Sequence, residues 1–544
     1  MAQAGGVMNQ PNDGKVYTKQ WVVDFMLDLV GYGTNSLGDL SCMRIVEPSC
    51  GTGSFLYEII RRLLANSSRR DYLSLKDAIR AYDIDQECVN HCKDTSRQIL
   101  VDDFGVDAGT ATALVSDWVV CGDFLLDHVE EDVDIVIGNP PYIRATDLDK
   151  DKRRAYVGAI ESMSAGTDIY VGFFDRALDI LKRGGKLCFI CADRWLQNRY
   201  GKILRRKIVR EGNLEILMRM HGVDAFAEEV DAYPAITLVG KDEQQERFKY
   251  VECDESFSEE NIDMLQASLN SDEDGNGDAW HLASLRMPFD PVAPIPLGTK
   301  RTVCFVEQAQ ERLPSIEDAG ISIGIGIATG CDGVFVADNP DVAEGSRMLP
   351  LFYMRDYRRK TGKHRWLVNP WDDKGNLVDL DEYPRMREYF ESHRSRLENR
   401  SVVRKSRNQW YRTIDKINYS LLNKPMLLMP DIAQEPLPVY NEGRYPHHNC
   451  YWIASEQWDM CALGGVLLSR QTKDFIDCLG VKMRGRSLRF QAQYLRLLHI
   501  PGFDTLSKEI VAGLQEAFER LDRDAATKWT ARMYEEAGIC CVRM

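Results

Sequence analysis

Between about residues 16 and 240, amphipathic helical stretches alternate with short apolar runs. This alternation is typical of a parallel β-sheet covered by helices, because parallel strands need a crossover connection that is usually a helix. The predicted strands are Arg44–Glu47, Ala78–Tyr82, Asp134–Ile137, Lys186–Cys191 and Pro234–Val239. The pattern predicts an α/β fold over residues 1–250, with a doubly wound, mostly parallel sheet.

The periodicity is lost over residues 251–300, which we interpret as a linker or a surface excursion. Ser271–Asp278 is polar and turn-rich, and prolines follow at positions 288, 291, 294 and 296. Further on, apolar runs punctuated by Gly and Pro, such as Gly324–Gly330 and Lys424–Pro430, predict short strands, and the residues from Ser507 onward predict helices. Residues 301–544 are therefore expected to form a second domain of mixed α/β structure.

The overall composition is that of an ordinary globular protein, with 44% hydrophobic and 28% charged residues. No apolar run is long enough for a membrane span, and the N-terminal residues do not resemble a signal peptide, so a cytoplasmic location is expected. The 15 cysteines are scattered without C-x2-C spacing, which predicts reduced thiols and no metal site.

Charge is distributed unevenly along the chain, whose formal net charge is −15. Ten acids and no Lys or Arg occur in Glu252–Asp278, whereas Tyr353–Arg365, Arg400–Lys416 and Lys482–Arg496 hold six, six and five basic residues. Arg400–Tyr419 also interleaves Trp and Tyr with its cations, a composition suited to phosphate and base contacts. The second half is thus predicted to bind nucleic acid, although the net charge disfavours indiscriminate binding.

Acidic and glycine residues follow three successive predicted strands. The first strand ends in Glu47 and continues into Gly51 and Gly53, which allow a tight turn and close approach to a ligand. Asp83-Ile84 follows the strand Ala78–Tyr82, and Asp123-Phe124 follows a further strand end predicted at Cys121; each pairs a carboxylate with an apolar side chain. Because doubly wound sheets bind ligands at the carboxyl ends of their strands, these residues predict one site for a ligand with a cationic group, a ribose and an adenine.

A strand over Asp134–Ile137 leads into Gly138-Asn139-Pro140-Pro141-Tyr142. Two consecutive prolines stiffen the backbone and remove two N–H donors. The Asn139 side chain and the Pro140 carbonyl can each accept one N–H of an exocyclic amine while Tyr142 stacks on the base. The run therefore predicts a site that binds and aligns an aromatic amine as a methyl acceptor.

The order of these motifs resembles the gamma class of DNA amino-methyltransferases, and in particular the TaqI-like modification enzymes of restriction-modification systems. The likeness is specific over residues 15–240 and continues more loosely in Gly324–Gly330, Lys424–Asp431 and Ser487–Pro501. It implies a Rossmann-like methyltransferase domain that uses S-adenosyl-L-methionine (AdoMet), followed by a target recognition domain. It also implies transfer of the methyl group to N6 of an adenine flipped out of double-stranded DNA.

The resemblance also implies roles for individual residues. Asn139, Pro140 and Tyr142 would be catalytic and would bind the flipped base with Phe226, although the family usually has Pro where this chain has Ala227. The implied cofactor contacts are Tyr17, Thr18, Glu47, Gly51, Gly53, Asp83, Ile84, Asp123, Phe124 and Asn139.

The sequence is compatible with other functions. Methyltransferases that act on RNA base amines or on a protein glutamine use the same Asn-Pro-Pro-Tyr run but leave the basic second half unexplained. A cytosine-N4 methyltransferase more often has Ser at position 139, and an inactive DNA-binding protein would not need residues 139–142. We expect a monomer, with any cognate restriction endonuclease or defence partner on a separate chain.

Overall fold

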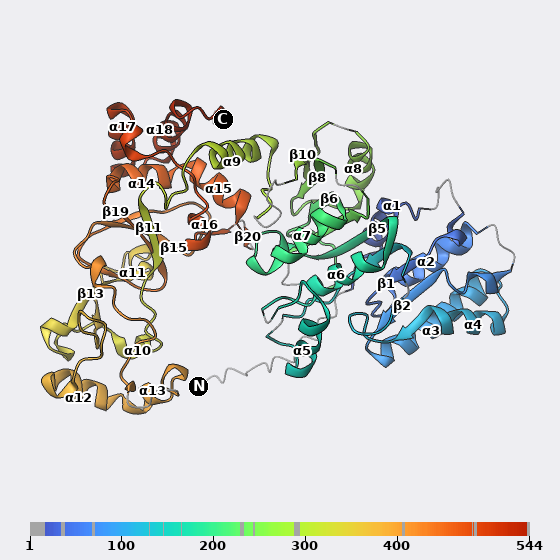
Figure 1. Ribbon diagram of the computed structural model, residues 1–544, viewed down its shortest axis with the longest axis horizontal. Helices are drawn as coiled ribbons and strands as arrows, with labels where there is room; N and C mark the ends of the chain where they lie inside the picture. Colours follow the sequence, from blue (N-terminus) through green and yellow to red (C-terminus); the bar gives the residue numbers. More distant parts are fainter. Residues whose placement is uncertain are drawn as a thin grey trace, which may run out of the picture. The chain divides into compact units, whose positions relative to one another are not determined.

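The computed structural model forms two compact units, Met1–Lys300 and Arg301–Met544, each described here by itself (Figure 1). The residues that the structure describes are 17–33, 39–67, 71–129, 131–144, 146–164, 166–228, 233–242, 245–271, 273–287, 294–404, 409–480, 482–483 and 487–540. Pro288, Pro291 and parts of the second and third basic stretches lie outside them.

The first unit is built on one sheet, in which the described residues form ten strands in the order β3-β2-β1-β4-β5-β7-β6-β8-β10-β9. Neighbouring strands from β3 to β5 are parallel, and β7 is antiparallel to both β5 and β6. The strands are β1 Ile45–Glu47, β2 Ile79–Asp83, β3 Val119–Cys121, β4 Val133–Gly138, β5 Leu181–Ala192, β6 Asn213–Arg219, β7 Pro234–Gly240, β8 Arg247–Cys253, β9 Gly275–Asn276 and β10 Trp280–Arg286. The helices are α1 Gln20–Leu29, α2 Ser54–Ala65, α3 Gln86–Gln98, α4 Ala108–Trp118, α5 Lys150–Ala159, α6 Tyr170–Ile180, α7 Lys202–Glu211 and α8 Ile262–Leu269.

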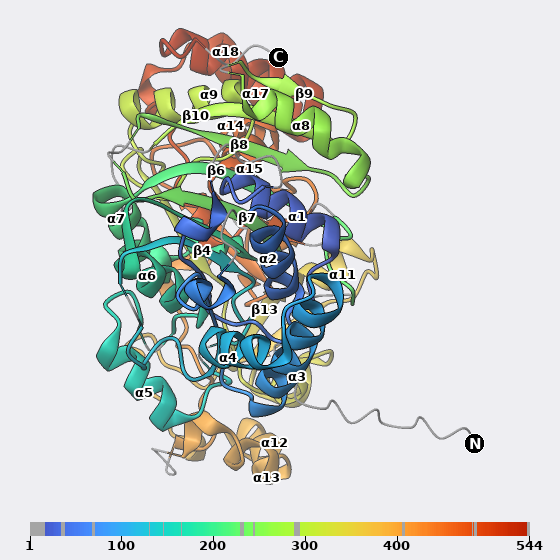
Figure 2. The same ribbon diagram turned by 90° about the vertical axis from the view of Figure 1, so that its right-hand side faces the viewer.

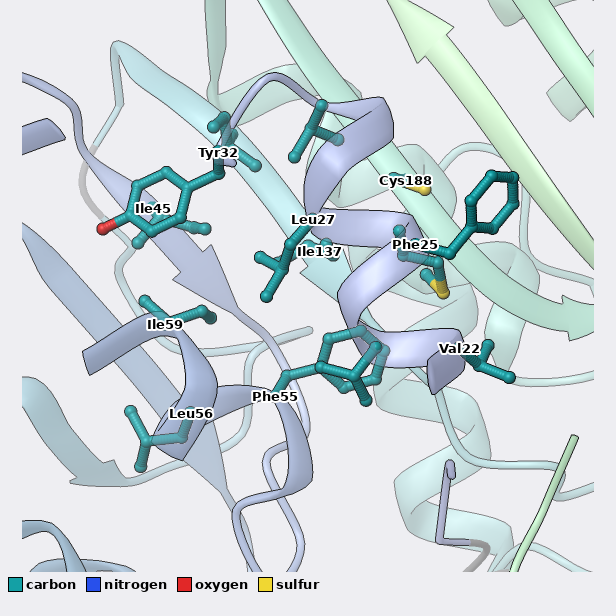
Figure 3. Packing of buried hydrophobic residues seen from close by; sticks show 14 of the residues in the cluster. Val22, Phe25, Leu27, Tyr32, Ile45, Phe55, Leu56, Ile59, Ile137 and Cys188 are labelled. Carbon is teal, nitrogen blue, oxygen red and sulfur yellow. The ribbon is translucent and has the colours of Figure 1, made fainter. Parts of the chain in front are cut away.

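Helices cover both faces of this sheet, because successive side chains of a strand point to opposite faces. On one face, α1 and α2 pack against Ile45, Ile137 and Cys188 (Figure 3). On the other face, the neighbouring β5 residue Phe189 contacts Phe174 of α6 with ring centroids 5.1 Å apart. Figure 2 shows α1 and α2 on one side of the sheet and α6 and α7 on the other. The expected doubly wound, mostly parallel sheet is therefore confirmed.

The structure differs from the sequence-based division over residues 251–300, where a linker or a surface excursion is predicted. β8 and β10 pair antiparallel and extend the sheet, and α8 lies between them in the chain. Ser271–Asp278 leads through the short edge strand β9 into β10. The polar composition of this segment reflects its position at the sheet edge, and the two units divide after Lys300.

The second unit has mixed α/β structure, as predicted. The described strands form three small sheets, ordered β11-β19-β15-β17, β12-β14-β13-β18 and β16-β21-β20. They are β11 Ile321–Ile325, β12 Val336–Ala337, β13 Met348–Phe352, β14 Arg365–Val368, β15 Met426–Pro430, β16 Ile432–Ala433, β17 Val439–Asn441, β18 Tyr445–Pro446, β19 Cys450–Ser455, β20 Lys482–Met483 and β21 Ser487–Arg489. The helices are α9 Lys300–Arg312, α10 Asp332–Phe335, α11 Met354–Arg358, α12 Pro384–Ser392, α13 Arg394–Glu398, α14 Met460–Leu468, α15 Arg470–Leu479, α16 Ala492–Leu495, α17 Lys508–Glu519 and α18 Arg523–Glu536.

The predicted C-terminal helices are α17 and α18. They pack with α14, whose Gly464 and Gly465 permit the close approach: a Cβ at Gly465 would lie 2.5 Å from the carbonyl oxygen of Leu514. Among the helices that the structure describes, none has the length and apolar character needed to span a membrane.

Candidate active site

Glu47 ends β1 and is almost completely buried, with 2% of its surface exposed. Its Oε2 atom has no hydrogen-bond donor among the described residues. Burial raises the pKa of this carboxyl well above its ordinary value, and the nearby Cys92 and Asp83 raise it further. Because an unsatisfied buried acceptor is costly, Glu47 is suited to accept from a cationic group of a bound ligand.

The glycine turn after Glu47 needs glycine for two different reasons. Gly51 and Gly53 have positive φ angles of +51° and +91°, which side chains with a Cβ rarely adopt. A Cβ at Gly53 would also lie 2.4 Å from the ring of Tyr57. Gly53 immediately precedes α2, so the turn fixes where that helix begins.

Asp83, at the end of β2, fastens this turn to the neighbouring strand end. Its Oδ2 atom accepts a hydrogen bond of 2.8 Å from the Gly51 N–H, and its Oδ1 atom accepts one of 2.9 Å from the Asp85 N–H. Each carboxylate oxygen still has a second lone pair that can accept from a ribose hydroxyl. The adjoining Ile84 is a large apolar side chain that is 60% exposed, which leaves it available to an aromatic ligand.

Asp123 and Phe124 follow β3 and have partners that the sequence did not indicate. The Asp123 carboxylate accepts a 2.8 Å hydrogen bond from the Tyr156 hydroxyl of α5. Phe124 is 2% exposed and stacks on Phe173 of α6, with ring centroids 5.6 Å apart and an interplanar angle of 16°. The aromatic run around Phe173 offered a sequence signal for this contact, whereas nothing near Tyr156 did.

Asn139 follows β4 and is held at both its side chain and its backbone. Its Nδ2 atom donates to the Thr18 hydroxyl at 3.2 Å, and its carbonyl oxygen accepts from the Ser49 hydroxyl at 3.2 Å. Ser49 lies in the turn after β1, and its contact was not expected from the sequence. These contacts join the predicted amine-binding run to the Glu47 end of the site.

Tyr17 and Thr18 are placed beside Asn139 by a short antiparallel pairing with a segment distant in the chain. Thr18 and Phe226 form an isolated β-bridge, and the N–H of Lys19 donates to the carbonyl of Ala225 at 3.0 Å. The Ala227 N–H donates to the Tyr17 carbonyl at 2.9 Å. Proline lacks this N–H, so the departure from the family pattern at Ala227 has a structural reason.

Phe226 and Tyr142 contact each other edge to face, with ring centroids 6.3 Å apart and an interplanar angle of 83°. The Tyr142 hydroxyl donates to the Ile190 carbonyl at 3.4 Å, and burial raises the pKa of this phenol. A base stacked between two rings needs parallel faces about 7 Å apart. In this arrangement at least one ring must turn before a base can lie between them.

The structure thus places the predicted residues from Glu47 to Tyr142 at or after the carboxyl ends of β1, β2, β3 and β4, whereas Tyr17, Thr18 and Phe226 come from the pairing of residues 17–19 with residues 225–227. A Cβ at Gly138 would lie 3.6 Å from Cγ of Glu47, and a Cβ at Gly51 would lie 4.0 Å from the ring of Tyr17. The cofactor residues and the amine-binding residues are therefore adjacent.

Three side chains of the basic and aromatic stretch Arg400–Tyr419 have partners within the second unit. The Arg400 guanidinium donates to the carbonyls of Thr329 and Trp410, and Trp410 is 7% exposed. The Tyr411 hydroxyl donates to the Val378 carbonyl. These side chains pack within the second unit, because aromatic rings next to Arg favour burial as readily as ligand contact.

A sheet of this strand order, in which β7 runs antiparallel to its neighbours β5 and β6 and the predicted cofactor residues lie at the carboxyl ends of β1, β2 and β3, defines a Rossmann-like methyltransferase domain. The family model for the Eco57I restriction-modification methylase matches residues 61–226. The chain belongs to the Type II methyltransferases of restriction-modification systems, because relatives of that name are more than 30% identical to it over nearly its full length.

Two relatives support this membership over nearly the full length. The Type II methyltransferase M.PaeR7I of Pseudomonas aeruginosa is 36% identical over 532 residues, which cover 96% of this chain and 91% of that protein. M.XhoI of Xanthomonas vasicola is 34% identical over 538 residues, which cover 96% of this chain and 97% of that protein.

The fold is also similar to a solved structure. The Type IIL restriction-modification enzyme MmeI, determined in complex with DNA, has a TM-score of 0.58 at 12% identity. The match covers 95% of this chain and 72% of MmeI.

Proposed function

We propose that this protein transfers a methyl group from AdoMet to N6 of an adenine that is flipped out of a specific site in duplex DNA. The observation that carries the proposal is the position of Asn139. Its side chain is oriented by Thr18, and its run lies between the buried Glu47 and the ring pair Tyr142–Phe226. This is the juxtaposition that methyl transfer to an aromatic amine requires.

The residues present fit AdoMet at the cofactor end. Glu47 has a buried, unsatisfied oxygen for the ammonium of the methionine part, and the turn of Gly51 and Gly53 leaves room for close approach. Asp83 and Ile84 would contact the ribose and the adenine, and Asp123 and Phe124 would contact the adenine from the next strand end. Tyr17 and Thr18 complete the site beside the methionine part.

AdoMet supplies a methyl group on a sulfonium, which is a strong electrophile. The protein then has to align the amine: the Asn139 side-chain oxygen and the Pro140 carbonyl accept its two N–H groups, which turns the nitrogen lone pair toward the methyl carbon. The S–C bond would break as the N–C bond forms, and the amine would then lose one of its two protons to solvent. Alignment of this kind supplies much of the rate enhancement of in-line transfers.

The adenine amino group cannot reach such a site from within the base stack. Extruding the base costs a few kcal/mol, which stacking and hydrogen bonds in the site offset. Tyr142 and Phe226 would provide the stacking after one of the rings has turned. The second unit would recognise the DNA sequence, and its stretch Tyr353–Arg365 carries five exposed cations for phosphate contacts: Arg355, Arg358, Arg359, Lys360 and Lys363.

One chain holds both the candidate active site and the proposed recognition unit, so we propose that it acts as a monomer. A cognate restriction endonuclease or defence protein would then be a separate chain that cleaves the unmethylated site.

The proposal is tested by incubating the protein with methyl-labelled AdoMet and unmethylated duplex DNA, followed by digestion to nucleosides and chromatography. We expect the label in N6-methyldeoxyadenosine. Label in N4-methyldeoxycytidine would overturn the adenine assignment, and label in RNA or protein alone would overturn the DNA assignment.

Asn139→Ala should abolish transfer in this assay while AdoMet binding, measured by calorimetry, stays within about 3-fold of the unmodified protein, because the side chain acts on the amine. Asn90→Ala on the exposed face of α3 is the control and should leave both quantities unchanged. An equal loss of transfer and binding in Asn139→Ala would contradict the acceptor role.

A further inference from the structure

Two histidines and an aspartate meet in the second unit. One ligand-type atom from each of Asp332, His447 and His448 lies within 4.8 Å of the others. Asp332 begins α10, whereas the two histidines connect β18 to β19, so segments more than 100 residues apart in the chain converge here.

The backbone holds the two segments together firmly. The N–H of Ile327 donates to the Pro446 carbonyl at 2.9 Å, and the N–H of His448 donates back to the Ile327 carbonyl at 3.0 Å. A Cβ at Gly326 would lie 2.2 Å from the carbonyl oxygen of His447, so this approach requires glycine. The histidines are therefore fixed in position by main-chain contacts.

His447 is the most informative member of this cluster. It is 1% exposed, and among the residues that the structure describes neither ring nitrogen has a hydrogen-bond partner. Its Nε2 atom lies 3.1 Å from Oδ2 of Asp332 but outside hydrogen-bond geometry. Buried polar groups are normally satisfied, so this imidazole indicates a missing ligand.

The 3.1 Å between Nε2 of His447 and Oδ2 of Asp332 fits two ligands of one metal ion as well as it fits an ion pair. Two ligands of a tetrahedral zinc ion with bonds of about 2.0–2.1 Å are separated by about 3.3 Å. The other oxygen of Asp332 accepts a 2.6 Å hydrogen bond from the Thr329 hydroxyl, which orients the carboxylate. His448 is exposed, so solvent can supply a further ligand.

We propose that Asp332, His447 and His448 bind one zinc ion, with solvent in the remaining position, and that the ion ties the loop after β11 to the connection between β18 and β19. Imidazole ligands favour zinc and similar transition metals, whereas Mg²⁺ prefers an all-oxygen site. The site goes beyond the proposed methyl transfer and is independent of it.

The test measures zinc bound to the full-length protein after dialysis with a weak competing chelator, by mass spectrometry of the metal content. We expect the unmodified protein to retain one zinc ion per chain. His448→Ala should lower the affinity for zinc by at least about 10-fold and should therefore lose the ion in this dialysis. His364→Ala is the matched control, because His364 is an exposed histidine outside the cluster. Asp332→Asn is a second variant that removes the carboxylate and should also weaken binding.

Thermal denaturation gives an independent readout that does not depend on activity. Zinc at roughly 100 times its Kd should raise the Tm by about 5–10 °C in the unmodified protein and in His364→Ala, but not in His448→Ala. The proposal is overturned if the unmodified protein binds no zinc, if Mg²⁺ binds equally well, or if the zinc content of His448→Ala is unchanged. The last result would assign the metal to cysteines elsewhere in the chain.

Discussion

Glu47 and Asn139 occupy the two halves of the candidate site, and each is held in place by its surroundings. For Glu47, the unsatisfied Oε2 atom costs about 1–3 kcal/mol in the ligand-free protein, which a cationic partner would recover. Asn139 is oriented by Thr18, which lies 121 residues earlier in the chain. Side chains placed this way are preorganised for binding.

The raised pKa of Glu47 gives a pH-dependent prediction. Because its pKa is higher in the folded than in the unfolded protein, this group contributes stability that is present below the ordinary value of 4.5 and is lost as the pH rises through the raised value. The ammonium of AdoMet favours the ionised form. At a pH below the raised pKa of the ligand-free protein and above the pKa of Glu47 in the complex, AdoMet binding should therefore release a proton, and its affinity should rise by up to about 10-fold for each unit of increasing pH.

Calorimetry in two buffers with different ionisation enthalpies measures this proton release. Glu47→Gln provides the control, since it keeps the shape of the side chain but cannot ionise. This variant should bind AdoMet more weakly and should not release the proton on binding. The same proton release in Glu47→Gln would show that another group is responsible.

Strand-end residues could be predicted from the sequence because their role follows from chain order alone. An acid or amide that ends or directly follows a buried strand lies at the carboxyl end of the sheet's strands, as Glu47, Asp83 and Asn139 do. Tyr156 and Ser49 could not be predicted in this way, because their contacts depend on how a helix and a turn pack in three dimensions.

At the level of elements, short apolar runs predicted the strands that carry the site. The predicted Asp134–Ile137 is β4, Val133–Gly138, and the predicted Pro234–Val239 is β7, Pro234–Gly240. The antiparallel direction of β7 could not be predicted, because the apolar sequence of a buried strand does not depend on the direction of the strands beside it. The pairing of residues 17–19 with residues 225–227 could not be predicted either, since each segment is too short to show the alternation of polar and apolar residues typical of a strand.

The turn between β1 and α2 should be more sensitive to substitution than an ordinary glycine turn. Gly53→Ala adds a clash with Tyr57 to the strain of φ +91°, whereas Gly31→Ala, after α1, adds strain at φ +78° with no atom within 4 Å. We expect Gly31→Ala to cost about 1 kcal/mol of unfolding free energy and Gly53→Ala about 2–3 kcal/mol.

Denaturant unfolding of the two variants checks these values, and calorimetry should show AdoMet binding weakened by at least about 10-fold only in Gly53→Ala. Equal effects of the two substitutions on stability and binding would mean that the turn tolerates a Cβ and does not shape the site.

For the whole molecule, the sequence predicted two α/β parts but misplaced the end of the first. Acidic, turn-rich residues at a sheet edge have the composition of a linker, and only the pairing of β8 with β10 reveals that they belong to the sheet. The second unit was harder to predict because its strands are short and lie in three small sheets whose pairing depends on distant residues. For the same reason, no periodicity indicated that Asp332 meets His447.

The central claim is that this whole chain methylates adenine at a specific DNA site. Its most direct test is to express the protein in a bacterial host that lacks DNA methylation and to sequence the genomic DNA by a method that detects N6-methyladenine. The account predicts methylation of one adenine within a single short motif, and none with Asn139→Ala. Unmodified adenine in DNA from cells that contain the folded, AdoMet-binding protein would contradict it.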